Sequence, residues 1–190
     1  MKIVVLENAL TQKSRYITLR PDNAVLRNND DFYLPSFSNN IMCSCGIVVR
    51  ITRLAKCIAP KFASRCYDSV TTGVTFVAID VMQQALNESL PCEEAYCFDR
   101  STAIGTQWLT PEQLSGESSL VMNIGEKAFL HTDSDIIATI DQCVAEVTQK
   151  LTLKMGDLVF LSSSNFLPVK EAENVVVTLN DAVTLDFQIK

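Results

Sequence analysis

The chain has 190 residues, a formal net charge of −6 and a hydrophobic fraction of 47%. This length and composition are typical of one globular domain that buries enough apolar surface to fold without disulfides or metals. Lysines and arginines are scattered along an acidic sequence, which argues against a nucleic-acid or anionic-membrane partner. No run of about 18 apolar residues occurs, so the sequence predicts no membrane-spanning segment.

The seven cysteines indicate the redox state of the cellular compartment in which the protein works. Their number is odd and no Cys-x-x-Cys pair occurs, so we expect free thiols in a reducing cytoplasm, where they act as small hydrophobic side chains. The apolar run 1–6 is too short for the core of a signal peptide. Cys43 and Cys45 would suit a zinc site only with further ligands, and the single histidine, His131, lies far away in sequence.

The N-terminal half of the chain reads mainly as strands. Apolar or alternating patterns predict strands over 2–6, 16–20, 46–54 and 73–79. The run 46–54 is rich in β-branched residues and is expected at the centre of the sheet, with the small residues 43–46 forming a mouth at its start. Short helices are expected after Pro60 and at Asp80, which would cap the second helix, and Pro91 stops it.

The C-terminal half combines one long helix with hairpins. Apolar residues recur at helical spacing over 134–150, with Thr132 and Asp135 as a capping-box-like start, so we expect this helix to pack on the sheet. Hairpins are predicted over 120–130 and 175–189. A strand is predicted at 158–161, followed by a polar loop at 162–165. Together these patterns predict an α+β fold that is mainly β, with mixed or antiparallel sheet, a few short helices and one longer helix.

Five separated blocks resemble the fumarylacetoacetate hydrolase family. They are LRPDNAVLRNNDDFYLPSFSNNI, GIVVRITRLAK, CFDRSTAIG, SDIIATIDQCVAEVTQKLTL and KMGDLVF, in the order that the family shows. The resemblance implies the family's β-roll and its homodimer. It also implies a single domain over 1–190, with a shortened N-terminal part at 1–35 and the core at 36–190.

Members of that family cleave acylpyruvates, or isomerise or decarboxylate related 2-oxo acids, with Mg²⁺ or Mn²⁺ held by carboxylates. The residue types follow from the chemistry, because a hard divalent ion prefers oxygen ligands. Such an ion chelates the 2-oxo acid and stabilises the enolate as a Lewis acid.

The resemblance places this metal site on residues that lack its charges. The family's Glu-x-Glu pair falls on Ser44 and Gly46, and its third carboxylate falls on Thr75. Its arginine falls on Ile79 and its lysine on Tyr96. Ser, Gly and Thr supply no negative charge for a divalent cation, so we expect no metal cofactor and no catalytic residue at these positions.

Some other residues of the family pattern are retained in this chain and others are absent. Asp80 and Asp99 are retained, the Gly-Thr-Pro loop falls on Ser162–Ser164, and the family's early histidine has no counterpart in the segment 7–15. The degenerate cleft positions are therefore Ser44, Gly46, Thr75, Ile79, Asp80, Tyr96, Asp99, Ser162 and Ser163.

The first functional hypothesis is a catalytically inactive member of this family, a cytoplasmic homodimer that binds an unknown small acid or a partner protein. The alternative is an active metal-dependent hydrolase, lyase or isomerase on acylpyruvate-type acids with a relocated site, for which Asp99 and Glu93 are the candidate acids. A weaker third option is a soft-metal or redox module built on Cys43 and Cys45.

Each candidate residue also has a structural interpretation, which we favour. Asp99 would bond a turn and Asp80 would cap a helix or pair with a cation. Glu93 and Glu94 would be a solvated face, and His131 a surface residue before a helix. The serines 162–164 could bind an anion through hydroxyl and N–H groups. A plain loop without a binding role explains the same sequence at least as well.

Overall fold

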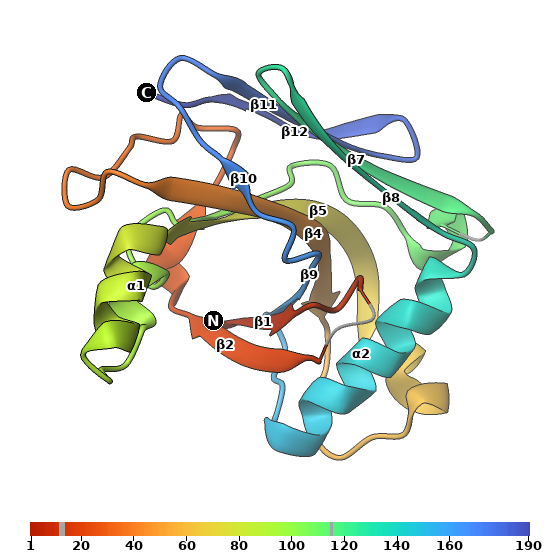
Figure 1. Ribbon diagram of the computed structural model, residues 1–190. Coiled ribbons are helices and arrows are strands. Elements are labelled where there is room, and N and C mark those ends of the chain that lie inside the picture. Colours follow the sequence, from red (N-terminus) through yellow and green to blue (C-terminus); the bar gives the residue numbers. More distant parts are fainter. Residues whose placement is uncertain (12–13, 115) are drawn as a thin grey trace.

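The computed structural model of the protein describes residues 1–11, 14–114 and 116–190; residues 12 and 13 of the predicted polar segment 7–15 lie outside this part of the chain. An eight-stranded mixed sheet curls into a roll in the order β2-β1-β9-β4-β5-β6-β3, with β10 paired to β4 (Figure 1). Its strands are β1 (Ile3–Glu7), β2 (Tyr16–Arg20), β3 (Val25–Leu26), β4 (Ile41–Ile51), β5 (Tyr67–Ala78), β6 (Thr102–Ile104), β9 (Leu158–Ser162) and β10 (Leu167–Pro168). The mainly-β α+β fold is confirmed.

A second, four-stranded sheet and two α-helices complete the fold (Figure 1). This sheet has the order β12-β11-β7-β8, with strands β7 (Ser118–Ile124), β8 (Lys127–Asp133), β11 (Asn174–Leu179) and β12 (Ala182–Gln188). The α-helices are α1 (Ile79–Asn87) and α2 (Ile136–Lys150). Short 3₁₀ turns are η1 (Asp22–Ala24), η2 (Pro60–Arg65), η3 (Glu93–Ala95) and η4 (Pro111–Leu114). Both predicted hairpins are confirmed.

Strand β4 lies at the centre of the roll, but its predicted start was wrong. It pairs with β5 residue for residue from Ile41 to Arg50 and with β9 from Gly46 to Arg50. Residues 43–46 therefore lie inside the strand and form no mouth in front of it. Local side-chain preference does not reveal this, because the small residues Cys43, Ser44 and Cys45 are held in extended form by their partners on β5.

The two faces of the roll are different. Alternation sends one set of side chains outward, where they form the main core with α2 and the four-stranded sheet. The other set points into the roll. Its apolar half holds Ile3, Val5, Val48, Ile104, Leu158 and Phe160. The neighbouring inward positions on the same strands are polar or glycine: Glu7, Ser44, Gly46, Thr102 and Ser162.

Helix α2 packs on the outer face of the roll, as the periodicity predicted. Its buried residues include Ile136, Ile140 and Val147, which join the main core. The predicted capping pair was wrong in detail: Asp135 itself is the N-cap, and its Oδ1 accepts a hydrogen bond from the backbone N–H of Ala138 at 3.0 Å. An N-cap carboxylate satisfies a backbone donor that the helix leaves unpaired.

Asp157 ties the turn before β9 to the start of β1. Its carboxylate pairs with the side chain of Lys2 and accepts the backbone N–H groups of Lys2 (3.1 Å) and Lys154 (2.9 Å). Burial alone would raise the pKa of Asp157, but the bonds from Lys2 and Lys154 outweigh burial and lower it. The charged form of Asp157 therefore stabilises the fold.

We expect Asp157→Asn to lower the free energy of unfolding by about 2 kcal/mol at neutral pH, the usual worth of a bond to a charged group. Because the folded-state pKa is lowered, this contribution is complete above the unfolded value of about 3.9 and is lost as pH falls through the folded-state pKa. Urea unfolding of both proteins between pH 7 and pH 2 checks this. A difference that stays constant down to the lowest pH would contradict it.

Candidate functional site

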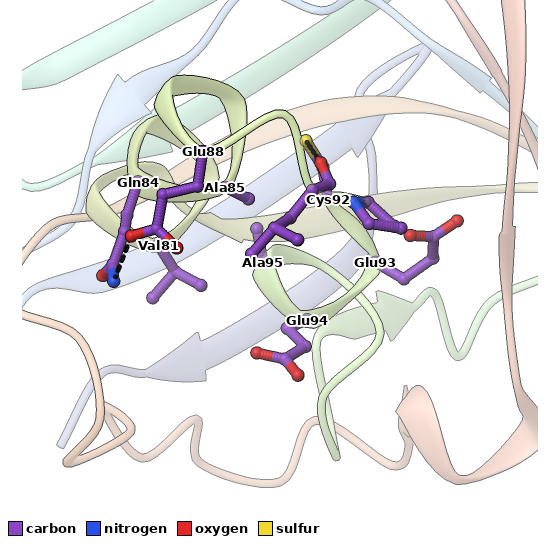
Figure 2. Close-up of a pocket in the computed structure, with 10 residues that line it drawn as sticks. Val81, Gln84, Ala85, Glu88, Cys92, Glu93, Glu94 and Ala95 are labelled. Carbon is purple, nitrogen blue, oxygen red and sulfur yellow. Dashed lines mark hydrogen bonds between the residues drawn. The ribbon is translucent and has the colours of Figure 1, made fainter.

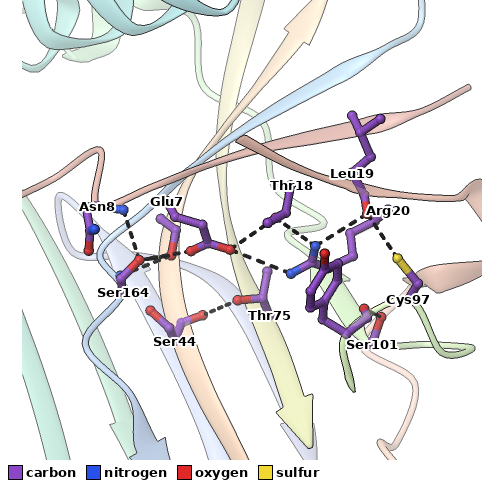
Figure 3. Close-up of polar contacts among 12 residues, drawn as sticks. Glu7, Asn8, Thr18, Leu19, Arg20, Ser44, Thr75, Cys97, Ser101 and Ser164 are labelled. Atoms are coloured by element: carbon purple, nitrogen blue, oxygen red, sulfur yellow. Dashed lines mark hydrogen bonds and ion pairs between the residues drawn. The ribbon is translucent and has the colours of Figure 1, made fainter. Parts of the chain in front are cut away.

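The polar half of the roll interior gathers three of the predicted cleft positions. Ser44 of β4 lies opposite Thr75 of β5 in register, and Thr75 Oγ1 donates to the backbone carbonyl of Ser44 at 3.3 Å (Figure 3). The hydroxyls of Ser44 and Ser163 lie 2.9 Å apart. All three residues are buried. The hydroxyls therefore bond to the protein itself, at the level where the resemblance places the family's carboxylates.

The fourth cleft position, Gly46, has no room for any side chain. A Cβ atom there would collide with the carbonyl oxygen of Leu161 and lie 2.6 Å from Cε1 of Phe160. Gly73, the register partner of Gly46 on β5, is covered by the same ring. The ring of Phe160 thus fills the space above a cross-strand pair of glycines. A carboxylate side chain at position 46 does not fit this packing.

A buried ion pair occupies the polar half beside these hydroxyls. Glu7 ends β1 and Arg20 ends β2, and their side chains are 5% and 1% exposed, with Arg20 Nη2 3.7 Å from Glu7 Oε1. Thr18 bridges the two: its hydroxyl donates to Glu7 Oε1 at 3.2 Å and accepts from Arg20 Nη1 at 2.8 Å. Figure 3 shows this network, which extends through Ser164 to the backbone of Asn8.

The guanidinium of Arg20 is enclosed on its faces as well as its edges. It stacks over the ring of Tyr96, with 4.2 Å from Cζ to the ring centroid. Burial lowers the pKa of Arg20 from its ordinary value, and the carboxylate of Glu7 opposes this shift. A guanidinium stays protonated over the whole physiological range, so Arg20 places a permanent positive charge at this end of the interior.

Two buried polar atoms of this region have no hydrogen-bond partner in the part of the chain that the structure describes. They are Arg20 Nε and Thr102 Oγ1, and Thr102 lies opposite Thr75 on β6. A cavity of about 530 Å³ is lined by Arg20 and Tyr96 together with Lys2, Thr18, Glu93 and Cys97. Unpaired buried polar atoms are costly, but Thr102 does not line this cavity and Arg20 Nε is shielded from solvent.

The remaining cleft positions do not join this cluster. Asp80 accepts from Ser38 Oγ (2.6 Å) and from the backbone N–H of Asn39 (2.8 Å), and it lies inside the first turn of α1 and not before it. Asp99 accepts a bond from Asn23, which is the turn-bonding role predicted for it. Ile79 opens α1, and its backbone N–H donates to the carbonyl of Asn40.

Ser162 and Ser163 are buried, so the predicted loop over 162–165 begins too early. Ser162 is the last residue of β9, opposite Gly46, and Ser163 donates its backbone N–H to Cys45. Their hydroxyls bond within the chain, to Ser164 and Ser44 respectively. Neither hydroxyl is free to bind an anion in this conformation, so the structure does not support the anion-binding interpretation of these two serines.

Cys43 and Cys45 point away from the polar half. Both alternate with Ser44 along β4 and join the main core on the outer face of the roll. Burial raises the pKa of Cys43 to about 12 and raises the pKa of Cys45 as well. Thiolates are the form that binds metals and reacts, so these buried thiols do not suit the soft-metal module.

His131 lies on β8, the strand before α2, and its side chain is partly buried. Its Nε2 is buried without a partner. Burial lowers the pKa of His131, and the nearby carboxylate of Asp133 opposes this shift. His131 lies opposite Leu120 in the four-stranded sheet, outside the roll interior.

The residues present do not fit a divalent-cation site. Among residues 1–11, 14–114 and 116–190, no three His, Cys, Asp or Glu side chains lie together as such a site requires. The carboxylate of Glu7 is already engaged with Arg20, Thr18 and Ser164. A guanidinium beside it would repel a second cation.

The central feature of the polar half, the Glu7–Arg20 pair, was missed by sequence reasoning. Both residues stand at the ends of apolar strands, where a charge normally marks the exit to solvent. The available signal was alternation: in an antiparallel β1–β2 hairpin, residues 3, 5 and 7 share a face with 16, 18 and 20. This shared face points into the roll and carries Glu7 and Arg20 at its polar end.

These features define an α+β roll whose interior cleft is occupied by its own hydroxyls, one ion pair and an aromatic ring. The chain belongs to the fumarylacetoacetate hydrolase family: the family model described as fumarylacetoacetate hydrolase C-terminal matches residues 5–189. No curated protein sequence matches the chain. No helix among the described residues is long and apolar enough to cross a membrane.

Solved structures of other proteins share the fold. A fumarylpyruvate hydrolase from Pseudomonas aeruginosa, in complex with Mn²⁺ and pyruvate, is 16% identical with a TM-score of 0.84, covering 99% of this chain and 88% of that one. A 2-hydroxyhepta-2,4-diene-1,7-dioate isomerase from Mycobacterium marinum is 20% identical with a TM-score of 0.84, covering 99% and 73%. A fumarylacetoacetate hydrolase family protein from yeast is 12% identical with a TM-score of 0.81, covering 100% and 92%.

Proposed function

We propose that this protein is a catalytically inactive member of the fumarylacetoacetate hydrolase family that has no metal cofactor. One observation carries the proposal. The positions where the resemblance expects three carboxylates hold Ser44, Gly46 and Thr75, and Gly46 is closed over by Phe160. The positive charge of a metal is replaced in the same interior by the guanidinium of Arg20, paired with Glu7.

We expect neither Mg²⁺ nor Mn²⁺ to bind the protein with millimolar or tighter affinity. Isothermal calorimetry and thermal unfolding with each chloride salt measure this, because a ligand that binds the folded state raises the unfolding temperature. The Pseudomonas aeruginosa fumarylpyruvate hydrolase, whose structure holds Mn²⁺ and pyruvate, is the positive control. Saturable binding together with a rise in unfolding temperature would refute the proposal, as would turnover of an acylpyruvate or of oxaloacetate.

The interior suits a small acid better than it suits a metal. The cavity beside Arg20 and Tyr96 is lined by the two cations Lys2 and Arg20 as well as by Glu93, and a carboxylate would pair with the two cations. We therefore propose metal-free binding of a small carboxylic acid as the remaining property of the cleft. Calorimetry with pyruvate and oxaloacetate in the presence of EDTA tests this, with acetamide as the uncharged control.

The alternative of a relocated catalytic site finds no support in the geometry. Asp99 is bonded to Asn23, and Glu93 is exposed to solvent at the cavity beside Arg20. Neither forms a cluster with other acidic side chains in the part of the chain that the structure describes. The homodimer and the cytoplasmic location remain proposals that rest on the resemblance and on the seven free cysteines.

A further inference from the structure

A groove on the outside of the protein runs between α1 and the segment that returns from it. We call it the α1 groove. Figure 2 shows Val81, Gln84, Ala85 and Glu88 on the helix side and Cys92 to Ala95 on the other. A cavity of about 470 Å³ lies between them, and a second of about 510 Å³ continues it past Val81 to Phe37 and Phe98.

The helix side of the groove is a single face of α1. Residues 81, 84, 85 and 88 are spaced by 3, 1 and 3, so they lie on one side of the helix. No residue of α1 is fully buried. The groove also leaves two large apolar side chains open to solvent, with Phe37 53% and Leu90 54% exposed. The floor of the groove is thus apolar and uncovered.

The rim of the groove is acidic. Glu88, Glu93 and Glu94 are exposed along it, and neither cavity has a lysine or arginine in its lining. Glu88 accepts a hydrogen bond from Gln84 at 3.1 Å. Among the described residues, no ion pair involves these three carboxylates. An apolar floor with an unneutralised acidic rim is complementary to a ligand that is apolar and positively charged.

We infer that the α1 groove docks a short amphipathic segment of a partner protein, with apolar side chains in the groove and lysine or arginine against its rim. The two cavities share the lining residues Val81, Gln84 and Glu94, so they adjoin, and an amphipathic segment has several apolar side chains to place in them. The net charge of −6 steers a basic segment toward the protein. Docking in the α1 groove needs no ligand in the cavity beside Arg20, and Glu93 is a lining residue that the groove and this cavity share.

The test uses a fluorescein-labelled peptide of leucine and lysine patterned as an amphipathic helix, with fluorescence anisotropy as readout. We expect saturable binding that weakens by about tenfold in the double variant Glu93→Lys/Glu94→Lys, through two lost rim charges. The matched control is Glu126→Lys/Glu171→Lys, which makes the same change of net charge on exposed residues of other loops and is expected to bind like the wild type. A peptide with glutamate for lysine is expected not to bind.

A third variant separates docking in the groove from general attraction between charges. Ala85→Glu adds negative charge and also fills the groove, so docking predicts weaker binding and bulk attraction predicts stronger binding. Urea unfolding confirms that each variant is folded before it is compared. The inference is overturned if no saturable binding occurs, if both charge-reversal variants weaken it equally, or if Ala85→Glu strengthens it. Self-association that Glu93→Lys/Glu94→Lys abolishes would also overturn it, since a second copy would then be the occupant.

Discussion

Replacing Gly46 by alanine is expected to lower the free energy of unfolding by about 3 kcal/mol, the upper end of what overpacking a core normally costs. The added methyl group meets the carbonyl oxygen of Leu161 and the ring of Phe160. The backbone contact is the harder of the two to relieve, because β9 is hydrogen-bonded to β4 on one side and to β1 on the other. Urea unfolding followed by circular dichroism gives the value.

The control for this variant is Ser44→Ala, on the same strand and the same face of the roll. It removes one hydroxyl contact, with Ser163, and is expected to cost about 1 kcal/mol. Adding Phe160→Leu to Gly46→Ala should restore part of the lost stability and no more, since the Leu161 carbonyl remains. A Gly46→Ala protein as stable as Ser44→Ala would show that the interior has room for a ligand-bearing side chain, contrary to the packing seen here.

Removing Arg20 is expected to have the largest effect of all. The variant Arg20→Met leaves Glu7 buried without its cation, and breaking a buried pair in this way costs about 3–5 kcal/mol. The double variant Glu7→Gln/Arg20→Met should be more stable than Arg20→Met alone, because it removes the uncompensated charge. Chemical unfolding of the three proteins at neutral pH forms the test.

Arg50→Met provides the matched control for the loss of an arginine. Arg50 pairs with Asp68 at 3.4 Å, with side chains that are 47% and 59% exposed, and such a surface pair is worth about 1 kcal/mol or less. Equal losses for Arg20→Met and Arg50→Met would mean that the interior pair is hydrated and does not close the cleft.

The sequence predicted the elements that carry their own periodicity. The helix 134–150 and the hairpins 120–130 and 175–189 were found because apolar residues recur at the period of the element. The start of β4 was missed, since Ile41 to Cys45 is held extended by pairing with β5 and β10, which are distant in sequence. Long-range pairing of this kind leaves no local signal in a single sequence.

The positions of the candidate site were predicted from the sequence, but the side chains that fill it were not. The resemblance identified Ser44, Gly46 and Thr75, which are brought to one level of the roll by the β4–β5 register. Arg20 and Phe160 lie in two of the matching blocks, but the resemblance did not place either residue in the cleft, which both reach from strands distant in sequence. What replaced the expected carboxylates is a property of cross-strand packing, which requires the three-dimensional arrangement.

The strand order has a consequence for biosynthesis. Strand β1 lies between β2, its neighbour in sequence, and β9, which ends at Ser162. A ribosome must therefore complete most of the chain before β1 gains its second neighbour and before Ser164 can bond to Glu7. Until then the first hairpin is an isolated pair of strands, which is marginal in water. The first hairpin therefore completes its folding only after β9 has been synthesised, and its exposed strand edge is prone to aggregation until then.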